Sequence, residues 1–515
     1  MSKGFYEKSN IASVTNPLNI TYDEILHKST KELDLWIDEL RQYIITQWDG
    51  EGQPPVIGQN EEDIIKNWRK LFGYDVDSFF DEDTKVVKNF NKFASGVNQF
   101  FPTMLKTKIS SGVSSEGATS IYDHFKEDDL RDKFKKAMLR GLFRDSMYSF
   151  GKSVKKKEMG MNIKEFLTHY NHHERFGITI VKMLNKMKCV ETEYLVLDAN
   201  EVMEYLESGH LTLQNLKTMA TDGDIEKYSS IPLEDYTELK NGDKRYYWYY
   251  VRLYNRQQRI FPSALQVFRL GLGQPAVNFP PLTAKFLYEH FTKHIDEKDK
   301  VIVYDPSAGW GGRILGAMTV KRDLHYIGTD PNPDNVGIYE RVGDFYNTHC
   351  FQSNPFFGKA SPNTFEVFKL GSEVIGNDEN FLKYFGKLDF VFTSPPYFNR
   401  EQYSQDENQS FKKFSAYEDW RDNFLKPTLT TAFSFLKNDR YLCWNIADIK
   451  IGENKFIPLE QDSIDVVESL GGEYKGIYKM LMTRMIGIDA SNVKNSVKIN
   501  GDAYKFEPIL VFYKS

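Results

Sequence analysis

At 515 residues the chain is too long for one ordinary hydrophobic core, and we expect two or three domains. Hydrophobic residues make up 41% of it, which is enough to fill such cores. The formal net charge of -6 comes from 66 basic and 72 acidic residues, so the charge of the whole protein does not draw it toward nucleic acid. An anionic partner must therefore meet a local basic patch.

The three cysteines lie far apart, and Cys189, Cys350 and Cys443 form no Cys-x-x-Cys pair. This spacing argues against a disulfide framework and a structural zinc site, and it favours a reducing compartment. The N-terminus "MSKGFYEKSN" has no apolar signal segment, and no apolar run approaches the ~20 residues that cross a bilayer. We expect a cytoplasmic protein that makes no use of a membrane.

The first part of the chain is predicted to be mainly helical. Apolar residues recur at helical spacing from Tyr22 to Trp48, and residues 63–72 repeat the pattern. The run "RYYWYYVRLY" at 245–254 predicts one strand, whose rings pack in a sheet or form a platform for bases. The stretch "HYNHHE" at 169–174 matches no standard ligand spacing, so we expect no metal.

A basic segment occupies residues 126–158, "KEDDLRDKFKKAMLRGLFRDSMYSFGKSVKKKE". Two interpretations stay open: a solvated amphipathic helix followed by a basic loop, or a surface that contacts phosphates. On the second interpretation, the candidate nucleic-acid-binding residues are Lys135, Lys136, Arg140, Lys155, Lys156 and Lys157.

The pattern changes after about residue 259. From Val301 onward, strand-like segments alternate with helix-like ones, which is typical of an α/β fold with a doubly wound, mostly parallel sheet. Near the end, "YKGIYKMLMTRM" and "FEPILVFYK" predict two strands of an antiparallel hairpin.

A glycine-rich turn, "DPSAGWGGR", follows the strand that begins at Val301. Its glycines allow a tight turn and a close approach to a ligand, and the next helix offers free N-H groups. About twenty residues further on, Asp330 ends the following strand, where an acidic side chain commonly binds ribose hydroxyls. Because no GxxxxGK[ST] loop is present, the pattern favours an adenosine-type cofactor without a triphosphate.

The segment "LDFVFTSPPY" ends a further strand in two prolines, which cannot donate to a sheet. The exocyclic amino group of a base is a poor nucleophile because its lone pair is delocalised into the ring. If Ser394 and the Pro395 carbonyl accept its hydrogens, the lone pair can turn toward an electrophilic methyl group. Tyr397 would stack on the base, a contact worth ~1 to 3 kcal/mol.

From about residue 278 to 515 the sequence resembles the amino-group DNA methyltransferases, which use S-adenosylmethionine to methylate adenine N6 or cytosine N4. "DPSAGWGG" is similar to their cofactor loop, and "TSPPY" to their catalytic tetrapeptide. The resemblance implies a class I methyltransferase-type sheet of seven strands, DNA as partner, flipping of the target base, and a role in DNA modification. Ser at the first tetrapeptide position favours cytosine N4 over adenine N6.

The resemblance also assigns the site residues. The catalytic set is Ser394, Pro395, Pro396 and Tyr397. The cofactor set is Phe279, Pro280, Asp305, Pro306, Ser307, Ala308, Gly309, Trp310, Gly311, Asp330, Pro331, Ser372 and Glu373. Ser307 replaces the usual aromatic and Trp310 a small residue, so Trp310 packs either on the cofactor or on a neighbouring helix. Ser372 and Glu373 lie near the adenine or form a plain surface turn.

We predict two regions: residues 1–265, mainly helical and devoted to target recognition, and residues 266–515, the methyltransferase domain. Arg400, in the polar loop after the tetrapeptide, either meets a phosphate of the DNA or belongs to a surface loop. Alternative functions are a methyltransferase of the same fold that acts on RNA or on a protein glutamine, and a non-catalytic binding protein.

Overall fold

The computed structural model of the protein describes residues 17–52, 54, 61–88, 93–109, 118–135, 137–138, 276–351, 361–398, 400–404, 406–451, 456–485 and 493–515. It also describes the backbone of four strands between residues 176 and 255. The chain divides into two compact units, which we describe separately. The first unit contains Gly58–Ile121 and Gln274–Ser515, and the second contains Tyr6–Ile57 and Tyr122–Gly273.

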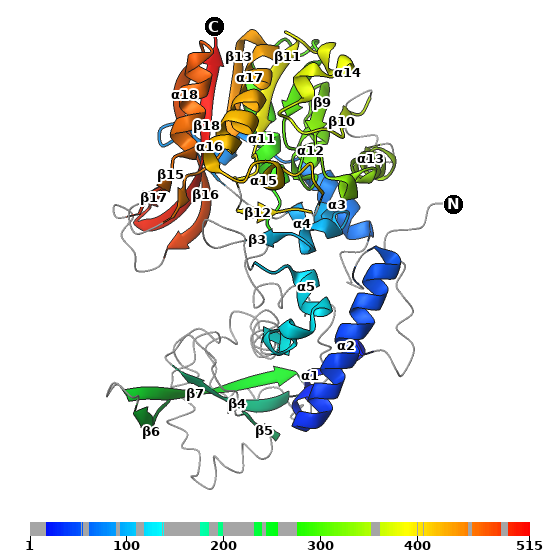
Figure 1. Ribbon diagram of the computed structural model, residues 1–515, viewed down its shortest axis with the longest axis vertical. Helices are drawn as coiled ribbons and strands as arrows, with labels where there is room; N and C mark the ends of the chain where they lie inside the picture. Colours follow the sequence, from blue (N-terminus) through cyan, green and yellow to red (C-terminus); the bar gives the residue numbers. More distant parts are fainter. Residues whose placement is uncertain are drawn as a thin grey trace. The chain divides into compact units, whose positions relative to one another are not determined.

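The first unit is built on one large sheet (Figure 1). Its central strands run in the order β16-β18-β13-β11-β8-β9-β10, with β1 and β2 beyond β16 and β17 paired to β18. The strands β10, β9, β8, β11 and β13 are parallel to one another, whereas β18 is antiparallel to both β13 and β16. The bounds are β1 (Phe80–Asp81), β2 (Val86–Val87), β8 (Val301–Asp305), β9 (Leu324–Thr329), β10 (Thr364–Phe368), β11 (Leu388–Thr393), β13 (Leu436–Asn445), β16 (Glu473–Met485), β17 (Ser496–Ile499) and β18 (Asp502–Lys514).

Numbered along the chain, the seven main strands have the order 3-2-1-4-5-7-6, with the seventh antiparallel. This is the arrangement of the class I methyltransferase fold, so the predicted fold class is confirmed. The C-terminal hairpin predicted from the sequence is the pair β16 and β18.

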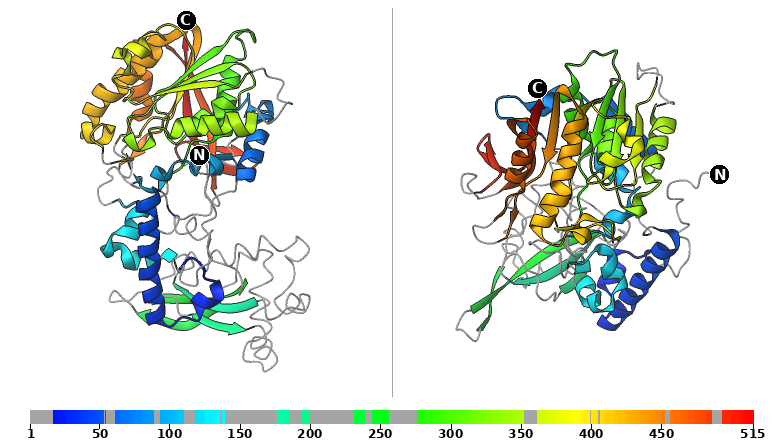
Figure 2. Two further views of the ribbon diagram at one scale, coloured as in Figure 1. Left: turned by 90° about the vertical axis from the view of Figure 1, so that its right-hand side faces the viewer. Right: turned by 45° about the horizontal axis from the view of Figure 1, so that its top comes forward.

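Helices cover both faces of this sheet (Figure 1, Figure 2). One face packs α11, α12 and α13 into a core with Phe390 and Phe392 of β11, and the other packs α14, α17 and α18 with Leu388 and Val391. β11 is buried along its whole length because it lies between these two layers. The bounds are α11 (Pro281–Thr292), α12 (Gly312–Met318), α13 (Ile338–Phe345), α14 (Glu379–Leu382), α15 (Ser410–Lys413), α16 (Tyr417–Trp420), α17 (Lys426–Phe435) and α18 (Leu459–Ser469).

Residues 61–109 belong to the first unit and complete one side of it. α3 (Glu61–Phe72) confirms the helix predicted there, and α4 (Ala94–Asn98) lies beside α12 in Figure 1. Trp68 of α3 packs its ring against Phe345 of α13, with centroids 5.3 Å apart. The buried Nζ of Lys285 donates to the Leu71 carbonyl at 2.8 Å, which fixes the C-terminal end of α3. The division predicted at residue 265 therefore differs from the observed units, because it separates this segment from its sheet.

The second unit contains helices and a sheet. The helical pattern predicted over 22–48 corresponds to two helices, α1 (Tyr22–Leu26) and α2 (Thr30–Glu51), because Ser29 forms a capping box with Glu32 and starts a new helix. α5 (Ile121–Lys126) follows. A four-stranded antiparallel sheet has the order β5-β4-β7-β6. Its strands are β4 (Phe176–Leu184), β5 (Tyr194–Asp198), β6 (Ile231–Glu238) and β7 (Lys244–Asn255), and β7 confirms the strand predicted from the aromatic run.

Candidate functional site

Three segments that are distant in sequence meet at one edge of the main sheet. Asp305 ends β8, Asp330 follows β9 and Ser394 follows β11, and β8 lies between the other two strands. Since the three strands are parallel, their carboxyl ends share one edge, where open α/β sheets bind ligands. The hydroxyl of Thr393 donates to Asp305 Oδ1 at 2.7 Å and joins the first and last of these segments.

Asp305 organises the turn after β8. Its buried carboxylate accepts hydrogen bonds from Arg313 Nε at 2.7 Å and from the Tyr326 hydroxyl at 2.6 Å. It also accepts from the Thr393 hydroxyl and from the Ser307 N-H at 3.2 Å. These four donors fill the acceptor capacity of a carboxylate. Asp305 therefore holds the turn in shape and reaches a ligand only through the residues that it positions.

The glycines of this turn serve two purposes. Gly309 and Gly311 have φ of 62° and 75°, in the left-handed region that favours glycine. A Cβ on Gly311 would lie 2.6 Å from the ring of Phe101, so this glycine lets the residues after α4 lie on the turn. A Cβ on Gly309 would meet its nearest atom, in Arg313, at 3.4 Å. Of the two glycines, only Gly309 has no atom closer than van der Waals contact at this position.

Asp330 is connected to the glycine turn by Tyr339 of α13. The Tyr339 hydroxyl contacts the Asp330 carboxylate and lies 2.5 Å from the Gly309 carbonyl oxygen. The carboxylate also accepts from Asn335 Nδ2 at 2.8 Å and from the Asn332 N-H at 2.9 Å. Burial raises the pKa of Asp330, although its side chain stays partly exposed at the sheet edge. With three donors against a capacity of about four, the carboxylate can accept one more hydrogen bond.

The tetrapeptide lies beside this edge. Ser394 and Pro396 are partly exposed, whereas Pro395 and Tyr397 are buried. The Tyr397 hydroxyl donates to Glu507 Oε1 of β18 at 2.7 Å. Its side chain is buried within the core cluster of this face of the sheet, so it does not stand free for a base to stack on in this conformation. The stacking role remains a prediction.

Two features next to the tetrapeptide mark a site. Phe398 has φ of 49°, a conformation that bulky residues rarely adopt and that tends to persist at functional sites. Asn445 ends β13, one residue past the partner of Thr393, and is fully buried. Its Nδ2 donates to the Pro508 carbonyl at 3.0 Å, whereas its Oδ1 has no hydrogen-bond partner among the described residues. A buried acceptor without a donor suits a ligand that carries an N-H group.

Trp310 packs against the loop that follows the tetrapeptide. Its ring centroid lies 5.5 Å from that of Tyr403, whose hydroxyl contacts Glu401. This loop is held in place because β12 (Glu401–Gln402) pairs with β3 (Lys108–Ile109). The interpretation of Trp310 as a wall beside the cofactor stays a prediction.

The segment before α11 lies against the glycine turn. Asn278 Nδ2 donates to the Trp310 carbonyl at 2.7 Å, and the ring of Phe279 lies 5.1 Å from that of Phe392. Pro280 caps α11. The structure thus brings Phe279 and Pro280 to the turn. Within the turn, the Ala308 N-H donates to the Thr329 carbonyl, and the Pro306 carbonyl accepts from the Thr329 hydroxyl at 2.6 Å. Pro331 follows Asp330 after β9.

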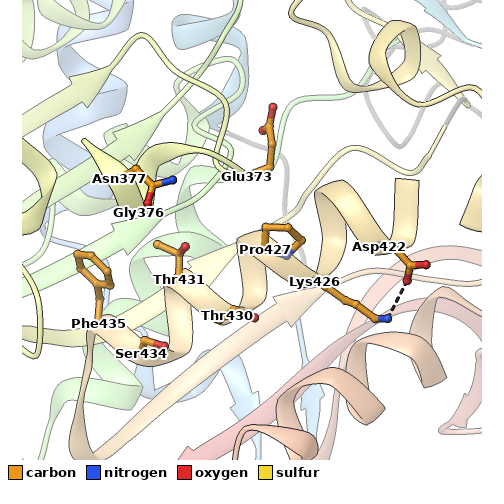
Figure 3. Close-up of a pocket in the computed structure, with 10 residues that line it drawn as sticks. All are labelled: Glu373, Gly376, Asn377, Asp422, Lys426, Pro427, Thr430, Thr431, Ser434 and Phe435. Atoms are coloured by element: carbon orange, nitrogen blue, oxygen red, sulfur yellow. Dashed lines mark ion pairs between the residues drawn. The ribbon is translucent and has the colours of Figure 1, made fainter. Parts of the chain in front are cut away.

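Ser372 and Glu373 lie toward α17. The buried Ser372 hydroxyl is 3.0 Å from that of Thr428, and Glu373 pairs with Lys413 at 2.9 Å. Glu373 also borders a hollow of about 400 Å³ along α17, which Figure 3 shows with the ion pair between Lys426 and Asp422. None of the residues that line this hollow belongs to the glycine turn or to the tetrapeptide.

The candidates for nucleic-acid contact are only partly described. Lys135 Nζ lies 2.6 Å from Asp34 Oδ1, so its charge is already compensated within the protein. Lys136, Arg140, Lys155, Lys156 and Lys157 lie outside the described residues, as does "HYNHHE". Arg400 is described, and its charge lowers the pKa of the nearby Glu507 against the larger effect of burial, which raises it. Within the described ranges, no three His, Cys, Asp or Glu side chains are placed to share a metal ion.

No helix among the described residues has the length and apolar character to span a bilayer.

No protein-family model matches the sequence, and no curated protein matches it significantly. Solved structures do match. One example is a precorrin-6Y C5,15-methyltransferase from Geobacter metallireducens GS-15, with 10% identity over 42% of this chain and 81% of that chain and a TM-score of 0.24. Another is TrmN from Thermus thermophilus, with 12% identity over 53% of this chain and 57% of that chain and a TM-score of 0.25. A SAM-dependent methyltransferase from Agrobacterium tumefaciens matches with 10% identity over 45% of this chain and 62% of that chain and a TM-score of 0.27. The class of the fold follows from the strand order of the sheet.

Proposed function

We propose that this protein transfers a methyl group from S-adenosylmethionine to the exocyclic amino group of a DNA base, with cytosine N4 favoured over adenine N6. The observation that carries the proposal is the meeting of the glycine turn, Asp330 and Ser394 at one sheet edge. The Thr393 hydroxyl donates a hydrogen bond to Asp305 at 2.7 Å, and the Tyr339 hydroxyl contacts both the Asp330 carboxylate and the Gly309 carbonyl.

The residues at this edge suit an adenosine cofactor. The left-handed backbone of Gly309 forms the tight turn beside this edge, and the carboxylate of Asp330 can accept from one further donor such as a ribose hydroxyl. S-adenosylmethionine, when bound, supplies an electrophilic methyl group on a sulfonium. The chain would contribute position: Ser394 and the Pro395 carbonyl hold the amino group so that its lone pair faces that methyl group.

The proposal is tested with labelled S-adenosylmethionine and DNA, RNA or protein as separate substrates. DNA should take up the label, and Ser394→Ala should reduce the uptake at least 10²-fold, a typical value for one positioned catalytic group. Titration calorimetry should show nearly unchanged cofactor binding in that variant. Ser434→Ala, a serine of α17 beside the hollow of Figure 3, is the matched control and should keep full activity.

Label in RNA or protein but not in DNA would contradict the proposed substrate. Undiminished DNA methylation by Ser394→Ala would contradict the role given to the tetrapeptide.

A further inference from the structure

Strand pairing places Asn445 next to the tetrapeptide. β11 and β13 are parallel neighbours, and Thr393 of β11 pairs with Trp444 of β13. One residue beyond this pair, the chain reaches Ser394 on one strand and Asn445 on the other. Both residues therefore lie at the carboxyl edge of the sheet, where open α/β sheets bind ligands.

The side-chain amide of Asn445 has a fixed orientation. Its Nδ2 donates to the carbonyl of Pro508 in β18 at 3.0 Å. With Nδ2 directed at β18, Oδ1 is turned away from that strand, and the strand on the other side of β13 is β11. The bond to Pro508 thus leaves the acceptor end of the amide for the side on which the tetrapeptide lies.

Oδ1 of Asn445 is a buried acceptor without a donor. The residue is fully buried, and Oδ1 has no hydrogen-bond partner among the described residues. Asn363, a buried asparagine just before β10, shows the usual arrangement. Its Oδ1 accepts from the Leu324 N-H at 2.9 Å, and its Nδ2 donates to the Ala317 carbonyl at 2.9 Å. Because an unpaired buried acceptor destabilises a fold, Asn445 Oδ1 is suited to a donor that a ligand brings.

Tyr397 links this acceptor to the entry of a base. Its hydroxyl lies 3.4 Å from the carbonyl oxygen of Asn445 and donates to Glu507 Oε1 at 2.7 Å. Since the side chain of Tyr397 is buried, it has to leave this position before it can stack on a base. Its departure opens the space next to Asn445, so the base enters where Oδ1 is within reach.

We propose that Asn445 Oδ1 accepts a hydrogen bond from the amino group of the target base and thereby determines which bases the enzyme methylates. This inference rests on the proposed function. Ser394 Oγ and Asn445 Oδ1, from neighbouring strand positions, share one amino hydrogen in a three-centre bond, and the Pro395 carbonyl accepts the other.

Asn445 adds a property that Ser394 lacks. A hydroxyl can accept or donate, so Ser394 alone would also bind a base that carries a carbonyl oxygen in place of the amino group. The amide of Asn445 can only accept at this position, because its Nδ2 is held by Pro508. A carbonyl base would bring two acceptors together with no hydrogen between them, and such a base is rejected.

The same bond should act on the rate of transfer. The nitrogen forms a bond to the methyl carbon and is positively charged until it loses a proton, so its hydrogens become stronger donors. The hydrogen bond to Asn445 is then stronger in the transition state than in the bound substrate, and such a bond raises kcat. The amide accepts the hydrogen bond but takes no proton.

The test measures the transfer of label from S-adenosylmethionine to DNA from cells that lack the protein. Asn445→Leu removes both polar atoms of the side chain, and kcat should fall about 10- to 100-fold. Asn445→Asp keeps an oxygen that accepts in either protonation state, so its kcat should exceed that of Asn445→Leu by about 5-fold or more. Calorimetry should show wild-type affinity for the cofactor in both variants, and it gives the amount of folded enzyme.

A purely structural role for Asn445 gives a different order. Both variants lose the donor to the Pro508 carbonyl, and Asn445→Asp also brings a second oxygen toward it. If this bond were all that mattered, Asn445→Asp would lose at least as much activity as Asn445→Leu.

Ser463→Ala is the matched control. The buried Ser463 hydroxyl donates to the Leu459 carbonyl within α18 at 2.6 Å, so this variant also takes the donor from a backbone carbonyl. It should keep the wild-type kcat. If Asn445→Leu does not fold, Asn445→Val removes the same acceptor with a residue that suits a strand, and its kcat should fall to the same extent.

Two results would overturn the inference. One is a wild-type kcat in the folded Asn445→Leu or Asn445→Val enzyme, and the other is a loss in Asn445→Asp as large as the loss in these variants. The two hypotheses fail separately. A wild-type enzyme that does not methylate DNA contradicts the proposed function, whereas one that does so and is matched by Asn445→Leu contradicts the role of Asn445 alone.

Discussion

The glycine turn after β8 and the tetrapeptide after β11 lie side by side at the sheet edge, yet they differ in how fully their polar groups are used. In the turn, Asp305 accepts from four donors, and Phe101 fills the space beside Gly311. Beside the tetrapeptide, Asn445 Oδ1 has no partner among the described residues, and Ser394 is partly exposed. The first loop is therefore a hydrogen-bonded frame, whereas a buried acceptor next to the second is left for the proposed substrate.

The largest effect on stability is expected when the turn after β8 loses the charge of Asp305, which holds its hydrogen bonds together. Asp305→Asn should lower the free energy of unfolding by about 3 to 5 kcal/mol, because it leaves the buried guanidinium of Arg313 without its counter-charge. Urea denaturation followed by circular dichroism measures this loss. The exposed ion pair of Glu407 and Lys412 provides the control, since Glu407→Gln should change stability by less than about 1 kcal/mol. Equal losses of unfolding free energy in the two variants would show that the hydrogen bonds of Asp305 do not hold the turn together.

A smaller effect separates backbone strain from crowding. Gly311 and Gly337 have nearly the same φ, 75° and 77°, but only Gly311 has neighbours where a Cβ would be placed. Gly337→Ala should cost about 1 to 2 kcal/mol for the left-handed conformation alone. Gly311→Ala should cost about 1 to 3 kcal/mol more, because the ring of Phe101 must move. Equal costs in denaturation experiments would mean that residues 93–104 do not press on the turn in solution.

The smallest effect concerns His290 of α11, which is remote from both loops. Burial lowers its pKa to about 4 from an ordinary 6.5, and its Nε2 lies 3.0 Å from the Tyr478 hydroxyl. Between pH 6.5 and about 4 the unfolded chain binds the proton and the folded chain does not, so stability falls as the pH falls. The partly exposed ring should contribute on the order of 1 kcal/mol.

This dependence is measured as the difference between the wild type and His290→Gln in denaturation at several pH values. The difference in unfolding free energy should change across this window and stay constant above pH 7. A difference that is constant throughout would show that the ring titrates normally in the folded protein.

Local patterns in the sequence were enough to predict the strands β8, β9 and β11, the glycine turn and Asp330. Such patterns involve residues that are close together in the sequence, so a strand that ends at Gly or Pro can be recognised from a few consecutive residues. The βαβ rhythm predicted a doubly wound, mostly parallel sheet, because this rhythm permits few topologies. The class I arrangement with seven strands was expected only from the family resemblance.

The partners of these residues could not be predicted in the same way. Tyr397 and Glu507 are 110 positions apart, and Phe101 reaches Gly311 from a segment that the sequence assigned to another region. Such contacts depend on tertiary packing and leave no local period. One signal was present: Glu507 lies within the apolar strand "FEPILVF", where a charged residue indicates a hydrogen-bond partner or a functional role. Ser372 and Glu373 likewise have partners far along the chain, Thr428 and Lys413, and their place near the adenine stays a prediction.

The central claim is tested most directly by mass spectrometry of nucleosides from the DNA of cells that express either the wild-type protein or Ser394→Ala. The account predicts N4-methylcytosine, or with the less favoured base N6-methyladenine, in wild-type cells and neither above background in the variant. Absence of both from the DNA of cells that contain folded wild-type protein would contradict it.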